Sequence, residues 1–210
     1  MNVQPTFDAQ AVLSDELMKD ERILWGGQPD PDRHFSAADV FLIPFSIMWG
    51  GFALFWEAGV LGLWGDSNGE EAPFFFVLWG IPFVFIGLYM MFGRFIYKAR
   101  KKRRTFYVVT DRRVLSLVRS QRGDKIQAAF IETIPSVNKR IRTDGSGSIT
   151  FGSSPSWSDW YANTGLEFMA WGWGGVGNTV VFYDVPDARQ VAKLVNDLRR
   201  RQTGLARNGQ

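Results

Sequence analysis

The chain has 210 residues, of which 46% are hydrophobic and 21% are charged, enough for one or two compact domains. It has no Cys and a single His, His34, which excludes disulfides, thiol catalysis and a multi-histidine metal site. The net charge of +3 hides an asymmetry, because residues 1–97 carry 4 Lys/Arg against 12 Asp/Glu and residues 98–210 carry 20 against 9. The two parts of the chain therefore differ in chemistry.

The first segment, residues 1–39, is polar and acidic, with 8 Asp/Glu against 3 Lys/Arg. No apolar run follows Met1, so we expect no cleavable signal peptide. The Gly- and Pro-rich stretch 26–32 indicates a turn or linker. We therefore treat residues 1–39 as an N-terminal segment separate from the domains that follow.

Two long apolar runs come next. Residues 40–64 contain one charge, Glu57, and residues 73–93 contain none. A bilayer has a hydrocarbon core about 30 Å thick, which a helix of roughly 20 apolar residues can cross. A buried helix of a soluble protein is the alternative, but two neighbouring runs this rich in Phe and Trp favour membrane spans. We predict transmembrane helices at 40–64 and 73–97, joined by an external loop at 65–72.

Basic residues gather on one side of the predicted spans. The loop 65–72 is acidic and contains no Lys or Arg, whereas seven cations lie at the end of the second run: Arg94, Lys98, Arg100, Lys101, Lys102, Arg103 and Arg104. Cytoplasmic flanks of membrane spans are enriched in Lys and Arg, so we expect a hairpin with both termini in the cytoplasm. The same seven cations are candidate contacts for anionic lipid headgroups of the inner leaflet.

Residues 98–201 are expected to form a β-rich cytoplasmic domain. Runs of β-branched and aromatic residues at 105–110 and 114–118 flank a turn, which is typical of a hairpin. Alternating apolar residues predict a second hairpin with a bulged three-residue turn at 144–146, which would pair Ile141 with Ile149.

The end of this domain is predicted to be helical. Short strands are expected at 166–170 and 179–184, before a helix at 186–201 whose apolar residues recur at the spacing of one helix face. Residues 202–210 are expected to be a disordered tail. Strands followed by one amphipathic helix fit a small barrel or sandwich that the helix closes.

Four stretches carry a family resemblance: residues 21–29, 42–52, 104–115 and 144–152. Together with the closing helix, they resemble the bacterial membrane proteins that carry a pleckstrin-homology-like (PH-like) domain. The resemblance implies two orthogonal antiparallel sheets with about seven strands, capped by a C-terminal α-helix. It also implies a place in the bacterial cytoplasmic (inner) membrane and no enzymatic activity. Eukaryotic PH domains bind inositol lipids through a long first hairpin loop, and the tight turn at 111–113 argues against that ligand.

Function remains divided between two classes at this point. The first is a non-catalytic, membrane-tethered binding or scaffolding module. The alternative is a subunit of a small oligomeric channel or transporter that uses Glu57, because acids inside a span often handle protons or ions. The free-energy cost of a charged Glu57 is small, however, if its side chain lies at the outer membrane interface. The sequence shows no pair of catalytic carboxylates, no Ser/His/Asp triad and no cluster of metal ligands. We therefore expect no enzymatic activity and no cofactor.

A possible partner surface on the β-rich domain combines two basic residues with tryptophans: Arg140, Arg142, Trp157, Trp160, Trp171 and Trp173. Packing within a loop is the alternative for the tryptophans. The stretch 172–177 matches the dinucleotide pattern G-x-G-x-x-G, but a predicted strand follows it where a phosphate site needs a helix. We expect anionic lipids as partners, together with a protein or a second copy of the chain. We expect no nucleic acid, because the basic run adjoins a span.

Overall fold

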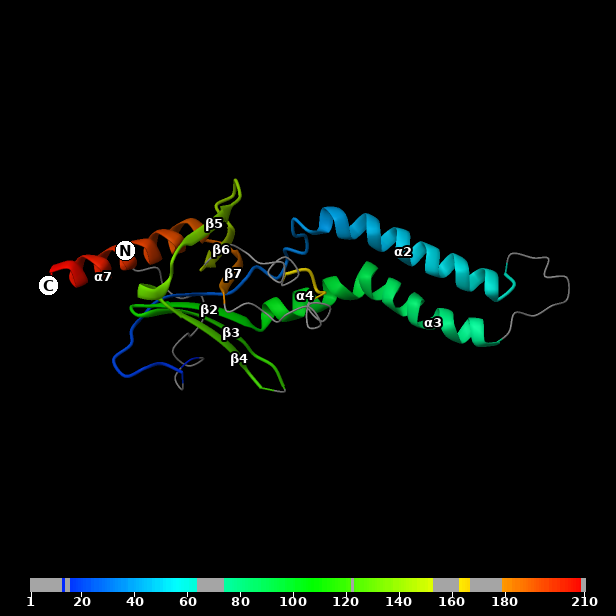
Figure 1. The fold of residues 1–210 in the computed structure, drawn as a ribbon, viewed down its shortest axis with the longest axis horizontal. Helices are drawn as coiled ribbons and strands as arrows, with labels where there is room; N and C mark the ends of the chain where they lie inside the picture. Colours follow the sequence, from blue (N-terminus) through cyan, green and yellow to red (C-terminus); the bar gives the residue numbers. More distant parts are fainter. Residues whose placement is uncertain are drawn as a thin grey trace.

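The computed structural model describes residues 13, 16–63, 74–121, 123–152, 163–166 and 179–208. Two long helices form one end of the molecule, and two sheets with a terminal helix form the other (Figure 1). The elements in chain order are β1 (Ile23–Gly27), α2 (Asp39–Val60), α3 (Phe74–Leu88), the π-helical turn η1 (Tyr89–Gly93), α4 (Arg94–Arg103), β2 (Thr105–Thr110), β3 (Arg113–Val118), β4 (Lys125–Phe130), the 3-10 turn η2 (Ile131–Thr133), β5 (Val137–Ile141), β6 (Gly147–Phe151), β7 (Val180–Val185) and α7 (Ala188–Asn208).

The two apolar helices form a hairpin (Figure 1). One is α2, with 22 residues, and the other is a continuous helix of 30 residues made of α3, η1 and α4. At 1.5 Å per residue, α2 is about 33 Å long, so both helices are long and apolar enough to cross a bilayer. The prediction of two long apolar helices is confirmed. The second helix runs beyond its predicted end at residue 97 and reaches Arg103.

Small residues let the two helices approach each other closely. A Cβ atom on Gly87 would lie 2.8 Å from the Cα of Gly50, so a larger residue at 87 would push the helices apart. The aromatic rings of Trp49 and Phe83 pack across the same interface, with their centroids 6.0 Å apart. The hairpin is therefore a packed unit and not two independent helices.

The strands form two antiparallel sheets, in the orders β1-β2-β3-β4 and β5-β6-β7. The predicted first hairpin is confirmed, because Val109 pairs with Val114 and leaves a tight turn between β2 and β3. Two sheets and a C-terminal helix confirm the coarse fold prediction. Strand β4 was not predicted, and most of the strand predicted at 166–170 lies outside the described residues.

Strand β1 comes from the segment ahead of the first apolar helix. It pairs with β2, with Trp25 opposite Val109. The Trp25 side chain is buried in the core and stacks on Phe182, with ring centroids 6.1 Å apart. Residues 23–27 are thus part of the β-sheet and not of a separate N-terminal segment, as the sequence had suggested. The helical hairpin is inserted between the first two strands of one sheet.

The β5–β6 hairpin has the predicted turn length but a different register. Ile141 pairs with Gly147, so its expected pairing with Ile149 is wrong, and the turn is 143–145. Gly145 decides the position, because its φ of +84° is a conformation that other residues rarely adopt. A shift of two residues keeps each side chain on its face of the sheet. Ile149 is accordingly still buried in the core.

The core of the β-rich end lies between the sheets and α7. Tyr107 and Phe182 stack there with their ring centroids 4.4 Å apart, and Val191 and Val195 of α7 are buried against them. The helix continues to Asn208, into the stretch that was predicted to be a disordered tail. The helix packs on the strands at the end of the molecule that faces away from the apolar hairpin (Figure 1).

Candidate functional site: a basic junction between the hairpin and the sheets

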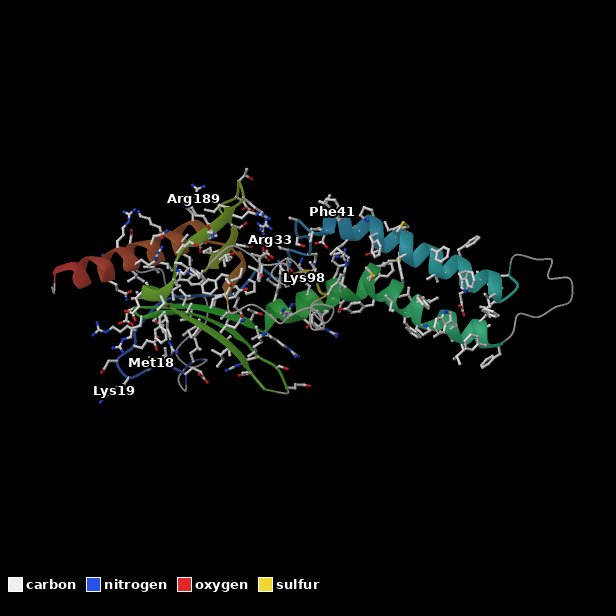
Figure 2. All side chains as sticks on the ribbon, in the orientation of Figure 1. Met18, Lys19, Arg33, Phe41, Lys98 and Arg189 are labelled. Carbon is white, nitrogen blue, oxygen red and sulfur yellow. The ribbon has the colours of Figure 1, made fainter. Side chains whose placement is uncertain are left out.

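Helix α4 carries six of the seven predicted lipid-contacting cations, and helical geometry separates them into groups. Residues four apart lie on one face of a helix, so Arg94, Lys98 and Lys102 form a row. These three side chains are only 1%, 4% and 4% exposed. Figure 2 shows Lys98 at the junction between the hairpin and the sheets. We call these three residues the inner row.

Arg94 joins the two apolar helices at the end of the hairpin nearest the sheets. Its Nη1 donates to Asp39 Oδ1 at 2.5 Å, and its Nε donates to the carbonyl of Met90 at 2.8 Å. Asp39 also accepts a hydrogen bond from the Ser36 hydroxyl at 2.8 Å. A buried cation without a partner would cost several kcal/mol, so this pairing fixes the start of α2 against the start of α4.

Lys102 joins α4 to the second sheet. Its Nζ donates to Asp184 Oδ2 at 2.7 Å and to the carbonyls of Asp30 and Arg33 at 3.1 and 2.6 Å. All three ammonium protons therefore have an acceptor. Between the two pairs, Lys98 Nζ donates to the carbonyl of His34 at 2.9 Å. The inner row thus ties α4 to the start of α2, to the segment between β1 and α2, and to the second sheet.

Asp184 is the acid through which the inner row reaches strand β7. Besides Lys102, its carboxylate accepts from Arg142 Nη2 at 3.0 Å and from Asn163 Nδ2 at 3.2 Å. Its backbone has a φ of 49°, which Asp tolerates better than most residues, at a register irregularity between β6 and β7. Burial raises the pKa of this carboxyl, but the hydrogen bond and charge of Lys102, with help from Asn163 and Arg142, lower it further, so that the net pKa is below its ordinary value.

The structure therefore divides the residues that the sequence singled out. Lys98, Lys102 and two of the three guanidinium nitrogens of Arg94 donate to protein acceptors, so the structure gives no support to an assignment of these residues to lipid headgroups. Only Nη2 of Arg94 has no hydrogen-bond partner among the described residues. Arg142 was assigned to a partner surface, but its guanidinium is paired with Asp184. The acids that make these pairs, Asp39 and Asp184, were missed. The remaining predicted cations are outside the inner row: Arg100, Lys101, Arg103, Arg104 and, on β5, Arg140.

The four tryptophans of the predicted partner surface lie outside the described residues. Trp157 and Trp160 fall in the gap at 153–162, and Trp171 and Trp173 fall in the gap at 167–178. Their assignment to a partner surface stays a prediction.

A basic cleft of about 690 Å³ opens between α4 and the adjoining ends of β2, β3 and β4. Seven cations line it: Lys98, Arg100, Lys101, Lys102, Arg104, Arg119 and Lys125. No Asp or Glu is among the described residues that line it. Tyrosine and serine hydroxyls supply further hydrogen-bond donors. Such a lining is suited to an anion, which gains from every fixed positive charge around it.

Glu57 lies in the last turn of α2, at the end of the hairpin away from the sheets. Its Oε2 is buried against Gly80 and has no hydrogen-bond partner among the described residues. A Cβ at position 80 would occupy the place of this oxygen. The facing helix α3 contains no charged residue, so it supplies no ionic partner for this carboxyl.

Comparison of the chain with protein-family models, curated proteins and solved structures gave no match. Among the residues that the structure describes, no three His, Asp or Glu side chains gather as a metal-binding group. The chemistry on which a function can be argued is that of fixed cations and hydrogen-bond donors beside two apolar helices.

Proposed function

We propose that the protein is an integral, multi-pass protein of the bacterial cytoplasmic membrane. In this proposal the hairpin of α2 and α3 spans the bilayer, and the β-rich end is a PH-like domain held against the inner leaflet. The domain acts as a non-catalytic binding or scaffolding module for a protein partner or for a second copy of the chain. A module confined to the membrane has a raised effective concentration toward partners in the same membrane.

The observation that carries this proposal is the buried inner row. Arg94 and Lys102 bind Asp39 and Asp184, and a single residue, Arg104, connects α4 to β2. The junction is therefore a rigid joint and not a flexible tether. A rigid joint supports a role in which the domain must present one surface to the membrane and another to a partner.

The order of elements supports the PH-like part of the proposal. Four strands, three strands and a terminal helix agree with the number that the resemblance implies. Because β1 precedes the hairpin, the first inter-strand connection of such a domain is the membrane hairpin itself. The tight turn at 111–113 lies between β2 and β3, so the argument it gave against a lipid ligand does not apply to the first connection.

The distribution of charge supports the proposed orientation. Arg100, Arg103 and Arg104 are exposed on the side of the hairpin that faces the sheets, near the basic cleft. Each Lys or Arg near an anionic surface contributes about 1 kcal/mol of attraction. The inner leaflet is therefore the favoured side for the β-rich end, and anionic lipids are its first partners.

The alternative, a channel or transporter subunit, depends on Glu57. The observation in its favour is that Oε2 of Glu57 has no hydrogen-bond partner in the part of the chain that the structure describes. Replacement of Glu57 by Gln keeps the shape and removes the charge. Loss of ion flux in vesicles that contain the purified variant, with flux in those that contain the wild type, would favour transport over the binding module.

Cysteine labelling of the otherwise Cys-free chain tests the orientation. We expect an impermeant thiol reagent to label Ser67→Cys in intact cells and to leave Ser120→Cys unlabelled until the cells are opened. Labelling of Ser120→Cys in intact cells, or recovery of the full-length chain from buffer without detergent, would overturn the proposal. A photo-crosslinker at Arg140, which is exposed on β5, then identifies what binds the domain.

A further inference from the structure

An apolar groove of about 830 Å³ runs along α4 and the first turns of α2. Ile43 and Ile47 line it from α2, and Met91 and Phe95 line it from the facing helix. Arg100 and Arg103 line the same groove. The groove therefore combines a long apolar wall with positive charge.

The lining changes along the helix from apolar to basic. Met91 lies within the hairpin, on the membrane side of the Arg94–Asp39 pair, whereas Arg103 lies on the side of the sheets. The distance along the helix between these two residues is about 18 Å. The apolar part of the groove, on the membrane side of Arg94, is placed to hold the carboxyl end of an acyl chain, and the basic end is placed to hold the headgroup.

The two arginines at the basic end are available to an external anion. Arg100 and Arg103 are both exposed, and neither forms an ion pair with a described acid. Arg100 also lines the basic cleft, so groove and cleft meet at this side chain. A guanidinium is suited to phosphate because its donors match two phosphate oxygens at once.

Arg94 provides an independent observation. Its side chain is 1% exposed and lines the groove, yet its Nη2 has no hydrogen-bond partner among the described residues. A buried donor without an acceptor is costly, and native structures rarely leave one. An ester oxygen of a glycerolipid, which lies between the phosphate and the acyl chain, is an acceptor of the required kind.

We propose that this groove binds one acyl chain of an anionic phospholipid from the cytoplasmic leaflet. Its phosphate binds Arg100 and Arg103, and an ester oxygen accepts from Arg94 Nη2. The inference rests on the proposed membrane location and adds to it a single, specific lipid site. It differs from general attraction to an anionic surface because it requires both the chain and the charge.

Native mass spectrometry of the full-length, delipidated protein in detergent tests the site, with phosphatidylglycerol as the probe. We expect one phosphatidylglycerol per wild-type chain and an affinity at least about tenfold lower for Arg100→Gln/Arg103→Gln. The matched control is Arg112→Gln/Arg189→Gln, which removes the same charge from exposed positions away from the groove and should bind as wild type does.

A second variant tests the apolar wall without changing the charge. Ala99 lines the groove, so Ala99→Trp should fill it and release the lipid, whereas Leu54→Trp on the exposed face of α2 should not. Wild-type protein should bind phosphatidylcholine with the same chains more weakly and should not bind glycerol phosphate.

Equal binding by wild type and by either groove variant would overturn the site, as would equal binding of the two phospholipids. If labelling shows the hairpin in the membrane with the expected orientation but no lipid is retained, the lipid site alone is refuted. If the chain is not in the membrane, both proposals fail together.

Discussion

Two sets of cations on the single helix α4 have opposite surroundings. Arg94, Lys98 and Lys102 are buried and bound to protein acceptors, whereas Arg100 and Arg103 are exposed. All five adjoin an apolar helix, and composition does not distinguish them. Their helical phase does, because the inner row has a spacing of four. A basic run at the end of a span can therefore divide its charges between a structural joint and a surface.

The largest expected effect comes from neighbouring residues of the two sets. Lys102→Met leaves Asp184 buried without its ammonium partner, and removal of one member of a buried pair costs about 3–5 kcal/mol. Arg103→Met, one position away and exposed, should change the free energy of unfolding by no more than about 0.5 kcal/mol. Denaturant unfolding in detergent, followed by Trp fluorescence, measures both. Similar losses in the two variants would contradict the division of α4 into two faces.

A somewhat smaller effect is expected at the other end of the inner row. Asp39→Ala leaves the buried Arg94 with the Met90 carbonyl as its one acceptor among the described residues and should destabilise the protein by about 3 kcal/mol. The double variant Asp39→Leu/Arg94→Met removes both charges and should recover most of that loss, because apolar replacement of a buried pair is often neutral. The same unfolding measurement applies. A double variant less stable than Asp39→Ala would show that the ion pair contributes more to stability than the offset of the cost of burying its two charges.

Gly165 contacts Arg94, so a substitution there tests how closely the chain packs on the buried face of α4. Its φ is +81°, and a Cβ there would lie 2.7 Å from the carbonyl oxygen of Arg94. Gly165→Ala should therefore cost about 1–3 kcal/mol, from strain and overlap together. Gly145→Ala is the matched control, because its φ of +84° is similar but its Cβ would meet nothing within 4 Å. Equal losses of stability in thermal unfolding would mean that the contact with α4 adds nothing.

The smallest expected effect is a dependence on pH. The pKa of Asp184 is lowered in the folded protein, so its ion pairs stabilise the fold above the ordinary Asp pKa of about 4 and lose that contribution as the pH falls through the folded-state value. The unfolding midpoint of the wild type should therefore decrease as the pH is lowered from about 5 into the acid range, where Asp184 becomes protonated. Asp184→Asn should show a smaller fall than the wild type. An identical pH profile for the two proteins would show that Asp184 does not cause the pH dependence of stability.

Local patterns were sufficient for much of the fold. The long apolar runs predicted the two helices, and β-branched residues around a tight turn predicted the β2–β3 hairpin. The amphipathic spacing of α7 was equally clear, because it repeats within a single element. Each of these signals is complete within a short window of sequence.

Features that depend on distant partners were missed. Strand β1 contains Trp25-Gly26-Gly27, which resembles a linker until its partner β2, far along the chain, is known. The inner row was visible as a spacing of four at 94, 98 and 102, but its acids could not be identified, since Lys102 and Asp184 are 82 positions apart. β4 was missed because Lys125–Phe130 has only one β-branched residue.

The insertion of the hairpin between β1 and β2 has a consequence for biosynthesis. The strand that leaves the ribosome first has its sheet partner only after both apolar helices have been made, so until then its edge is open to wrong pairing. Synthesis of both apolar helices and closure of the sheet are therefore successive steps in the formation of one fold. A chain that stalls before its second helix has β1 but none of the other strands of that sheet.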